Sequence, residues 1–150
     1  MGSRDGGVDR GGGRVLRPEL APGERRRLMR RGVDLFNRGD FFASHEAFEE
    51  IWRSTTPEPR DLFQGLVQVA AGLHHFVGRR SPAPAGRVLA RGRRRLAPLA
   101  PHCCGLDLAA LLPALEAWEA WLAAPAGEPP ALPRLALGEE QTGRGPSPQE

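Results

Sequence analysis

The residues best suited to chemistry lie in one short stretch, where an imidazole is followed by closely spaced carboxylates. His45 and Glu49 are four residues apart, so on a helix they project from one face, one turn apart. Glu46 directly follows His45, and Arg53 lies within reach of the carboxylate of either Glu49 or Glu50. Imidazole and carboxylate groups at this spacing can bind a divalent metal ion or exchange a proton with a substrate.

A second set of polar residues interrupts an apolar stretch between residues 61 and 77. Gln64, Gln68 and His75 stand there among large apolar side chains, a composition typical of the central helix of a bundle. A buried amide without a hydrogen-bond partner costs about 1–3 kcal/mol, so these side chains need partners. We therefore predict one buried polar network between the two stretches. Its candidate residues are His45, Glu46, Glu49, Arg53, Gln64, Gln68 and His75.

Three functions are open to such a network. In a structural or interaction domain, which we favour, the network sets the register of the helices without chemistry. In a metal-binding protein or metal-dependent hydrolase, His45, Glu49 and His75 would hold Zn, Mn or Fe, and Glu46 would be a general base or would support a ligand. In a nucleic-acid-binding protein, the Arg-rich stretch 85–99 would neutralise phosphates. We do not expect nucleic acid as the partner, because no aromatic residue is interleaved in that stretch for base stacking.

Helical periodicity dominates the chain. It predicts an all-α fold, a single compact bundle of about five helices, and no stretch alternates with the period of two that is typical of a strand. Asp40 and Asp107 are the expected N-caps of two helices, and Pro113 is expected to divide the last one. The expected helices cover residues 24–37, 40–53, 61–77, 85–99 and 107–122.

Two features predict how the helices pack. Phe41 and Trp52 share the face of His45, so we expect His45 to lie among core aromatic residues. Gly65 and Gly72 are seven residues apart and open one face of the central helix. Because each glycine costs about 1 kcal/mol in a helix relative to alanine, we expect a neighbouring backbone or a ligand to approach them closely.

The composition changes along the chain in two ways. Segments poor in large apolar residues flank the predicted bundle, and the charged residues are unevenly distributed. The chain has 150 residues, its 21 basic residues are all Arg, and its formal net charge is +3. Residues 22–100 carry 15 Arg and 8 acidic residues, whereas residues 101–150 carry 2 Arg and 7 acidic residues. An anionic partner or an ordinary solvated surface would account for this asymmetry. The segments 1–21 and 125–150 have few large apolar residues, so we expect disordered tails around a domain at 22–124.

Location and assembly follow from what the chain lacks and from its cysteines and tryptophans. No apolar run is long enough to cross a membrane, and the first residues lack the apolar core of a signal peptide, so we expect a cytoplasmic protein.

Cys103 and Cys104 are adjacent, which disfavours a disulfide between them and agrees with reduced thiols. Trp118 and Trp121 lie beside Leu122 at helical spacing, a pattern typical of a core face or a homodimer face.

The two polar stretches also resemble a known family. The resembling motifs are segment 36–42 with His45, Glu46 and segment 49–53, and segment 60–72 with His75. Together they resemble the small bacterial family catalogued as domain of unknown function 309, over roughly residues 28–112. The resemblance implies an all-helical bundle and assigns no activity. This chain departs from the family at Ala43, where an acidic residue is usual, and at Ser81–Pro84, which replaces a short Gly-Asn turn.

Overall fold

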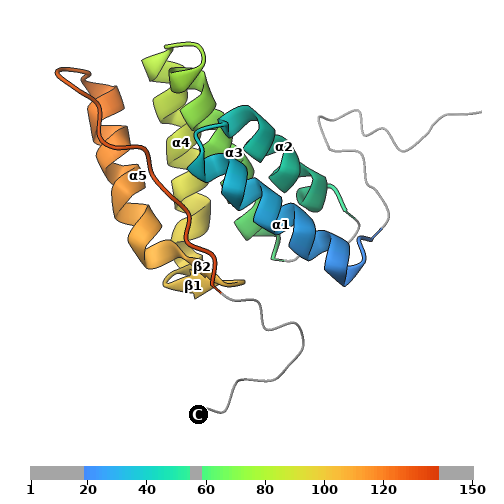
Figure 1. Ribbon diagram of the computed structural model, residues 1–150. Helices are drawn as coiled ribbons and strands as arrows, with labels where there is room; N and C mark the ends of the chain where they lie inside the picture. Colours follow the sequence, from blue (N-terminus) through green and yellow to red (C-terminus); the bar gives the residue numbers. More distant parts are fainter. Residues whose placement is uncertain (1–18, 55–58, 139–150) are drawn as a thin grey trace, which may run out of the picture.

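The computed structural model describes residues 19–54 and 59–138, and within them five α-helices make up most of the chain, as predicted. Each helix packs mainly on the next one along the chain, which forms a compact all-α bundle (Figure 1). The helices are α1 (Pro22–Asn37), α2 (Phe41–Trp52), α3 (Arg60–Val77), α4 (Pro82–Leu96) and α5 (Leu108–Ala123). No helix in the described ranges has the length and apolarity needed to cross a bilayer. Residues 1–18 and 139–150, where we expect disordered tails, lie outside the described residues.

Two aspartates begin helices as predicted. The Asp40 carboxylate, ahead of α2, accepts a hydrogen bond from the Ala43 backbone N–H at 3.3 Å. The Asp107 carboxylate, ahead of α5, accepts one from the Ala110 backbone N–H at 3.0 Å. Each bond satisfies one of the N–H groups that the start of a helix leaves without an intrahelical partner. The starts of both helices are therefore determined by side chains that can be read from the sequence.

Prolines affect the last two helices differently from the prediction. α4 begins at Pro82 rather than at residue 85, because a proline in the first helical turn needs no N–H donor and already has a helical φ. A short 3₁₀ turn, Ala97–Leu99, follows α4. α5 continues through Pro113, so the predicted division of this helix is wrong. Pro113 and Ala109 are both exposed, so water can reach the Ala109 carbonyl that Pro113 leaves without a donor.

A small hairpin precedes α5, although the sequence predicts no strand. Its strands, β1 (His102–Cys103) and β2 (Leu106–Asp107), pair antiparallel. Cys104 (φ 53°) and Gly105 (φ 85°) both lie in the left-handed region, as a two-residue hairpin turn of this kind requires. Strands of two residues are too short to show alternation of polar and apolar residues, so periodicity could not predict them.

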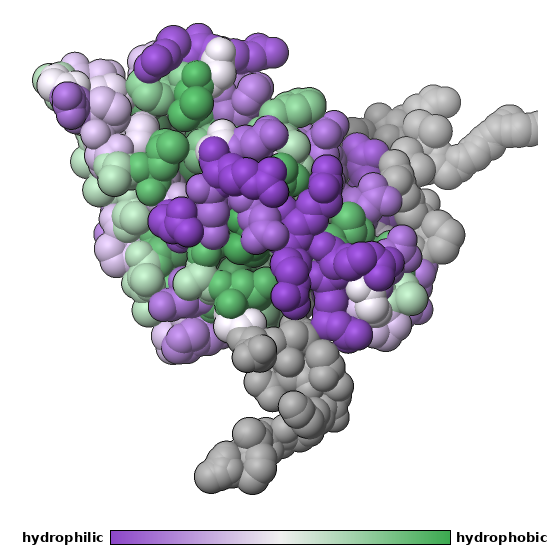
Figure 2. Space-filling model, viewed as in Figure 1, coloured by the Kyte–Doolittle hydropathy of each residue, from purple (hydrophilic) through white to green (hydrophobic). Residues whose placement is uncertain are grey.

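Residues 125–138, which we name the C-terminal strap, fold back over the bundle. The Asn37 side chain binds both backbone groups of Leu135: Nδ2 donates to the carbonyl at 2.9 Å, and Oδ1 accepts from the N–H at 2.8 Å. The Trp118 indole N–H donates to the Ala131 carbonyl at 2.8 Å, and Leu135 is only 4% exposed. The strap runs between α5 and α1 (Figure 1), and apolar side chains show along its course beside the hydrophilic surface of α1 (Figure 2). The strap's partners lie on distant helices, which its own composition does not reveal.

α3 lies at the centre of the bundle and packs closely on α4. A Cβ added at Gly72 would lie 2.8 Å from the Leu89 backbone nitrogen, and one added at Gly65 would lie 3.2 Å from the Gly92 carbonyl oxygen. Because these distances leave no room for a side chain, the two helix backbones approach each other directly. Of the two neighbours predicted for the α3 glycines, a backbone or a ligand, the structure places the α4 backbone there.

Candidate functional site

α2 turns a somewhat different face to the core than its aromatic spacing predicts. Phe41 and Phe48 are buried, but Ser44 is also fully buried, whereas His45 is only half-buried. The Ser44 hydroxyl donates a hydrogen bond to the Gly32 carbonyl of α1 at 2.8 Å, which allows a polar side chain at this position. The core face of α2 is therefore rotated toward Ser44, and His45 lies at its edge rather than among the core aromatic residues.

Three candidate residues form a row along this edge, which we name the α2 row (His45, Glu49 and Arg53). His45 Nε2 lies 3.6 Å from Glu49 Oε1, and Arg53 Nη2 donates a hydrogen bond to Glu49 Oε2 at 3.1 Å. The side chains of His45 and Glu49 are 23% and 26% exposed, so water reaches the row, and Glu46 beside it is exposed. His45 Nδ1 is nevertheless buried without a hydrogen-bond partner among the described residues. The contacts predicted from the four-residue spacing are confirmed, and they connect residues of one helix.

The polar strip of α3 does not meet the α2 row. Gln64, Gln68 and His75 are all half-buried, and Gln68 Oε1 accepts a hydrogen bond from Arg95 Nε of α4 at 3.2 Å. Among the described residues no network joins the strip to the row, so the predicted buried polar network is wrong. α3 is the third of five helices and packs against α2 and α4. These two neighbours do not cover all of α3, so water reaches one side of it. Its amides therefore need no buried partner.

The outer contact between α2 and α3 runs through Phe42, a residue outside the predicted set. The centroid of its ring lies 5.7 Å from that of His45 and 5.3 Å from that of His74, and Phe42 is 51% exposed. We name these three residues the Phe42 patch. The start of α2 lies opposite the end of α3, as in an antiparallel pair, and His74 rather than the predicted His75 faces Phe42, because adjacent helical residues project about 100° apart. This geometry is the signal from which the pairing could have been predicted.

The predicted metal ligands are not gathered at one point. Glu49 lies near His45 on α2, but His75 lies on α3 and belongs to neither the α2 row nor the Phe42 patch. In the parts of the chain that the structure describes, no three His, Cys, Asp or Glu side chains are grouped so that they could hold a metal ion. Two ligands from a single helical turn leave a tetrahedral set incomplete. The structure therefore gives the metal interpretation no support.

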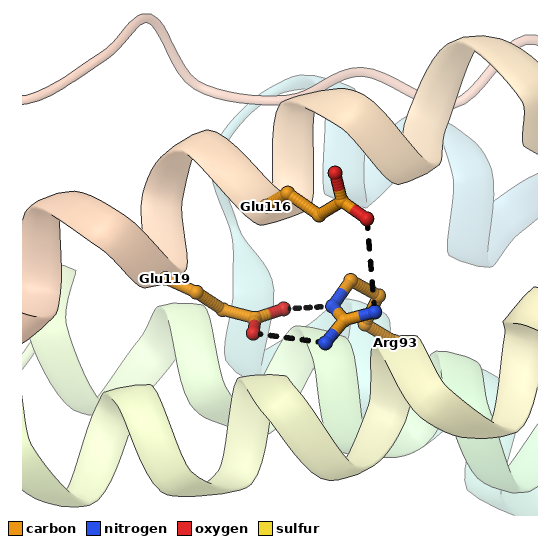
Figure 3. A network of polar contacts seen from close by, with 3 residues as sticks. All are labelled: Arg93, Glu116 and Glu119. Carbon is orange, nitrogen blue, oxygen red and sulfur yellow. Dashed lines mark hydrogen bonds and ion pairs between the residues drawn. The ribbon is translucent and has the colours of Figure 1, made fainter.

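The arginines of α4 divide into two sets, the first of which, Arg93 and Arg95, binds acidic side chains. Arg93 points toward α5, where it forms a bidentate ion pair with Glu119 and lies 3.8 Å from Glu116 (Figure 3). The hydrogen bond to Glu119 raises the pKa of Arg93 above its usual value, helped by the charges of Glu119 and Glu116 and opposed by burial. Arg93 and Glu119 are 26 residues apart, so helical spacing could not predict this pair. The second set projects into solvent and consists of Arg87, Arg91 and Arg94.

Comparison with known proteins agrees with the resemblance noted in the sequence. Residues 29–88 match the family DUF309, which is described as a domain of unknown function. The match runs from α1 into α4 and contains every predicted site residue, although it is shorter than the expected 28–112. Among curated proteins, none matches the chain. The family resemblance is therefore confirmed for these helices, and it brings a fold without an assigned activity.

Proposed function

We propose that the DUF309 domain of this chain is a protein-interaction scaffold and that it binds a partner protein through the Phe42 patch. The observation that carries the proposal is the exposed ring of Phe42, which lies against His45 on its own helix and His74 on α3. An aromatic side chain supported from two helices is suited to recognition, because both neighbours belong to regular structure and hold it in a defined place.

The energetics of the patch favour binding. Burying a fully exposed Phe side chain contributes about 1.5–3 kcal/mol, so covering the open half of Phe42 contributes about 1 kcal/mol. The two imidazole rings restrict the phenyl ring before binding, so less side-chain entropy is lost when a partner covers it. Phe is among the aromatic residues enriched in the cores of protein–protein interfaces.

Charged groups follow the patch along α2. The α2 row supplies a carboxylate and a guanidinium, and Glu46 is exposed one turn after Phe42. A polar rim around an aromatic centre is the usual composition of a reversible interface. His45 and Glu49 of the α2 row are not buried, so a partner seated on this face can reach them.

Substitution of Phe42 tests the proposal. We expect Phe42→Ser to abolish capture of at least one protein from a cell extract, measured by quantitative mass spectrometry. Leu132→Ser on the C-terminal strap is the matched control, because Leu132 is a similarly exposed apolar side chain (46%) and is not part of the Phe42 patch. Equal capture by the unmodified chain and both variants, with unchanged circular dichroism, would contradict the proposal.

A second copy of the chain is one partner that this test must include. The alternative homodimer face, Trp118 and Trp121, is not available as a whole, because Trp118 is 1% exposed and packs against Phe76. If the Phe42 patch binds a second copy, light scattering gives a dimer for the unmodified chain and a monomer for Phe42→Ser. A monomer in both cases restricts the partner to a different protein.

A further inference from the structure

Three arginines form an exposed stripe on α4. Arg87, Arg91 and Arg94 follow the spacing of one helical face and are all exposed. Within the described residues, none of the three takes part in an ion pair, whereas Arg93 binds Glu119 and the remaining arginine of this stretch, Arg95, binds Asp61. Like charges one helical turn apart repel each other and destabilise the helix. The stripe therefore carries positive charge that the described part of the chain leaves uncompensated.

The stripe borders a groove between α4 and α5. Its α4 side is built from small residues, among them Ala83, Gly86 and Ala90, and its α5 side is formed by Leu122 and Ala123. A Cβ added at Gly86 would lie 3.6 Å from the Leu122 Cβ, an ordinary contact, so this floor has space above it. The groove thus combines an apolar floor with a cationic edge.

The acidic groups near the groove are already engaged. Glu119 lines the groove but forms the ion pair with Arg93. Asp61, beside Arg91 and Arg94 in the adjoining hollow, binds Arg95 at 3.1 Å. A carboxylate from outside the described residues can therefore approach the stripe without competing with an internal acid.

We propose that this groove binds an amphipathic helix of a partner protein, with its apolar face on the small-residue floor and its acidic side chains paired with Arg87, Arg91 and Arg94. The site lies on α4 and α5, so the proposal goes beyond the interaction through the Phe42 patch and does not depend on it. A partner helix has the same rise of about 1.5 Å per residue as α4, so carboxylates four and three residues apart match the spacing of the stripe. Arginine binds carboxylates through paired hydrogen bonds that strengthen this match.

An acidic helix fits the groove better than nucleic acid does. Phosphates would use the arginines but gain nothing from the floor of Ala83, Gly86, Ala90 and Leu122. None of the described residues that line the groove is aromatic, so bases would find no stacking platform there. An apolar face flanked by acids uses both features of the groove at once.

Fluorescence anisotropy with a synthetic probe tests the charge match. The probe is a labelled peptide of about 18 residues with leucines on one face and glutamates beside them at spacings of four and three. We expect the double variant Arg91→Glu/Arg94→Glu of the full chain to lower the affinity about tenfold or more, because attraction becomes repulsion. The control variant Arg30→Glu/Arg31→Glu changes the charge equally on the exposed face of α1 and should leave the affinity within about twofold. A probe with arginines in place of glutamates should bind the α4 variant more tightly than the unmodified chain.

Filling the groove tests the apolar contact separately. Gly86→Trp should abolish binding of the acidic probe, whereas Gly86→Ala should preserve it, since a single Cβ is accommodated. Circular dichroism establishes that each variant keeps its helix content. If the probe loses affinity for the charge variant but not for Gly86→Trp, only diffuse electrostatic attraction is present, and the proposal is overturned. Tighter binding of single-stranded DNA than of the peptide at the same ionic strength would overturn it in favour of nucleic acid.

Discussion

Arg93 and Arg95 lie two residues apart on α4 and both bind carboxylates, yet their surroundings differ. The side chains of Arg93 and Glu119 are 22% and 19% exposed, whereas those of Arg95 and Asp61 are 39% and 61% exposed. Water screens the second pair more strongly, so the two pairs stabilise the fold to different extents. The raised pKa of Arg93 means that its stabilising contribution is complete below the usual arginine pKa and is lost only as the pH rises beyond it. Arg93 itself therefore adds no pH dependence near neutrality.

This difference can be measured with double-mutant cycles at the level of single residues. Arg93→Ala and Glu119→Ala, alone and together, should give a coupling free energy of about 1–2 kcal/mol in urea unfolding at neutral pH. The matched cycle on Arg95 and Asp61 should give less than about 0.5 kcal/mol, because that pair is more exposed. Equal coupling energies in the two cycles would show that burial of the Arg93 pair does not strengthen it.

At the scale of elements, glycines determine how closely α4 approaches its two neighbours. On the α3 side, Gly65 and Gly72 meet backbone atoms of α4 with no space for a side chain. On the α5 side, Gly86 forms part of an open groove floor. A glycine that faces α4 from α3 therefore cannot be replaced by alanine without a collision, whereas Gly86 on the α5 side of α4 can. This contrast gives a test with an internal control.

Gly72→Ala should destabilise the protein by about 1–3 kcal/mol, because the new methyl group collides with the Leu89 backbone. This loss outweighs the gain of about 1 kcal/mol that alanine brings to a helix interior. Gly86→Ala should instead raise the free energy of unfolding by about 0.5–1 kcal/mol, since its methyl group finds space. Urea unfolding of both variants is the measurement. If both substitutions stabilise the protein, the backbones of α3 and α4 lie further apart at Gly72 than in this structure.

At the scale of the whole molecule, the C-terminal strap connects the two ends of the helix series. α5 holds the strap through the Trp118 indole and α1 holds it through Asn37, while Leu137 bridges to Leu106 in the hairpin. A segment outside the helices thereby ties the first helix to the last, two elements that are far apart in the sequence. Its contribution depends on a few anchors, with Leu135 buried among them.

Removal of residues 125–150 should therefore lower the free energy of unfolding by about 2.5–4 kcal/mol. The estimate combines about 1.5–3 kcal/mol for exposing Leu135 with about 1 kcal/mol for the Trp118 hydrogen bond. The control is a chain that ends at Gly138, which keeps every described contact of the strap and should unfold at the urea concentration of the full chain. If the chain that ends at residue 124 and this control have the same urea midpoint, the strap does not anchor the bundle.

Local sequence determined the helices, their caps and the contacts within them. Periodicity predicts the five helices, Asp40 and Asp107 determine where two of them start, and the four-residue spacing predicts the contacts of Glu49 with His45 and Arg53. These features follow from the sequence alone because each depends on residues within one or two turns of each other. The close approach to the α3 glycines was also predictable, because an open helix face requires a neighbour. The identity of that neighbour, α4, could not be predicted.

Tertiary structure alone decided which faces are covered. The helical wheel of α3 identifies a polar strip but not that its side stays open to water, so the buried network was predicted wrongly. The pairing of Arg93 with Glu119, the contact of Phe42 with His74 and the path of the strap join residues far apart in the chain. Periodicity gives the angle at which a side chain leaves its own helix, whereas burial depends on where the other helices lie around that axis. That second quantity is set by packing of the whole chain and is not encoded in any single segment.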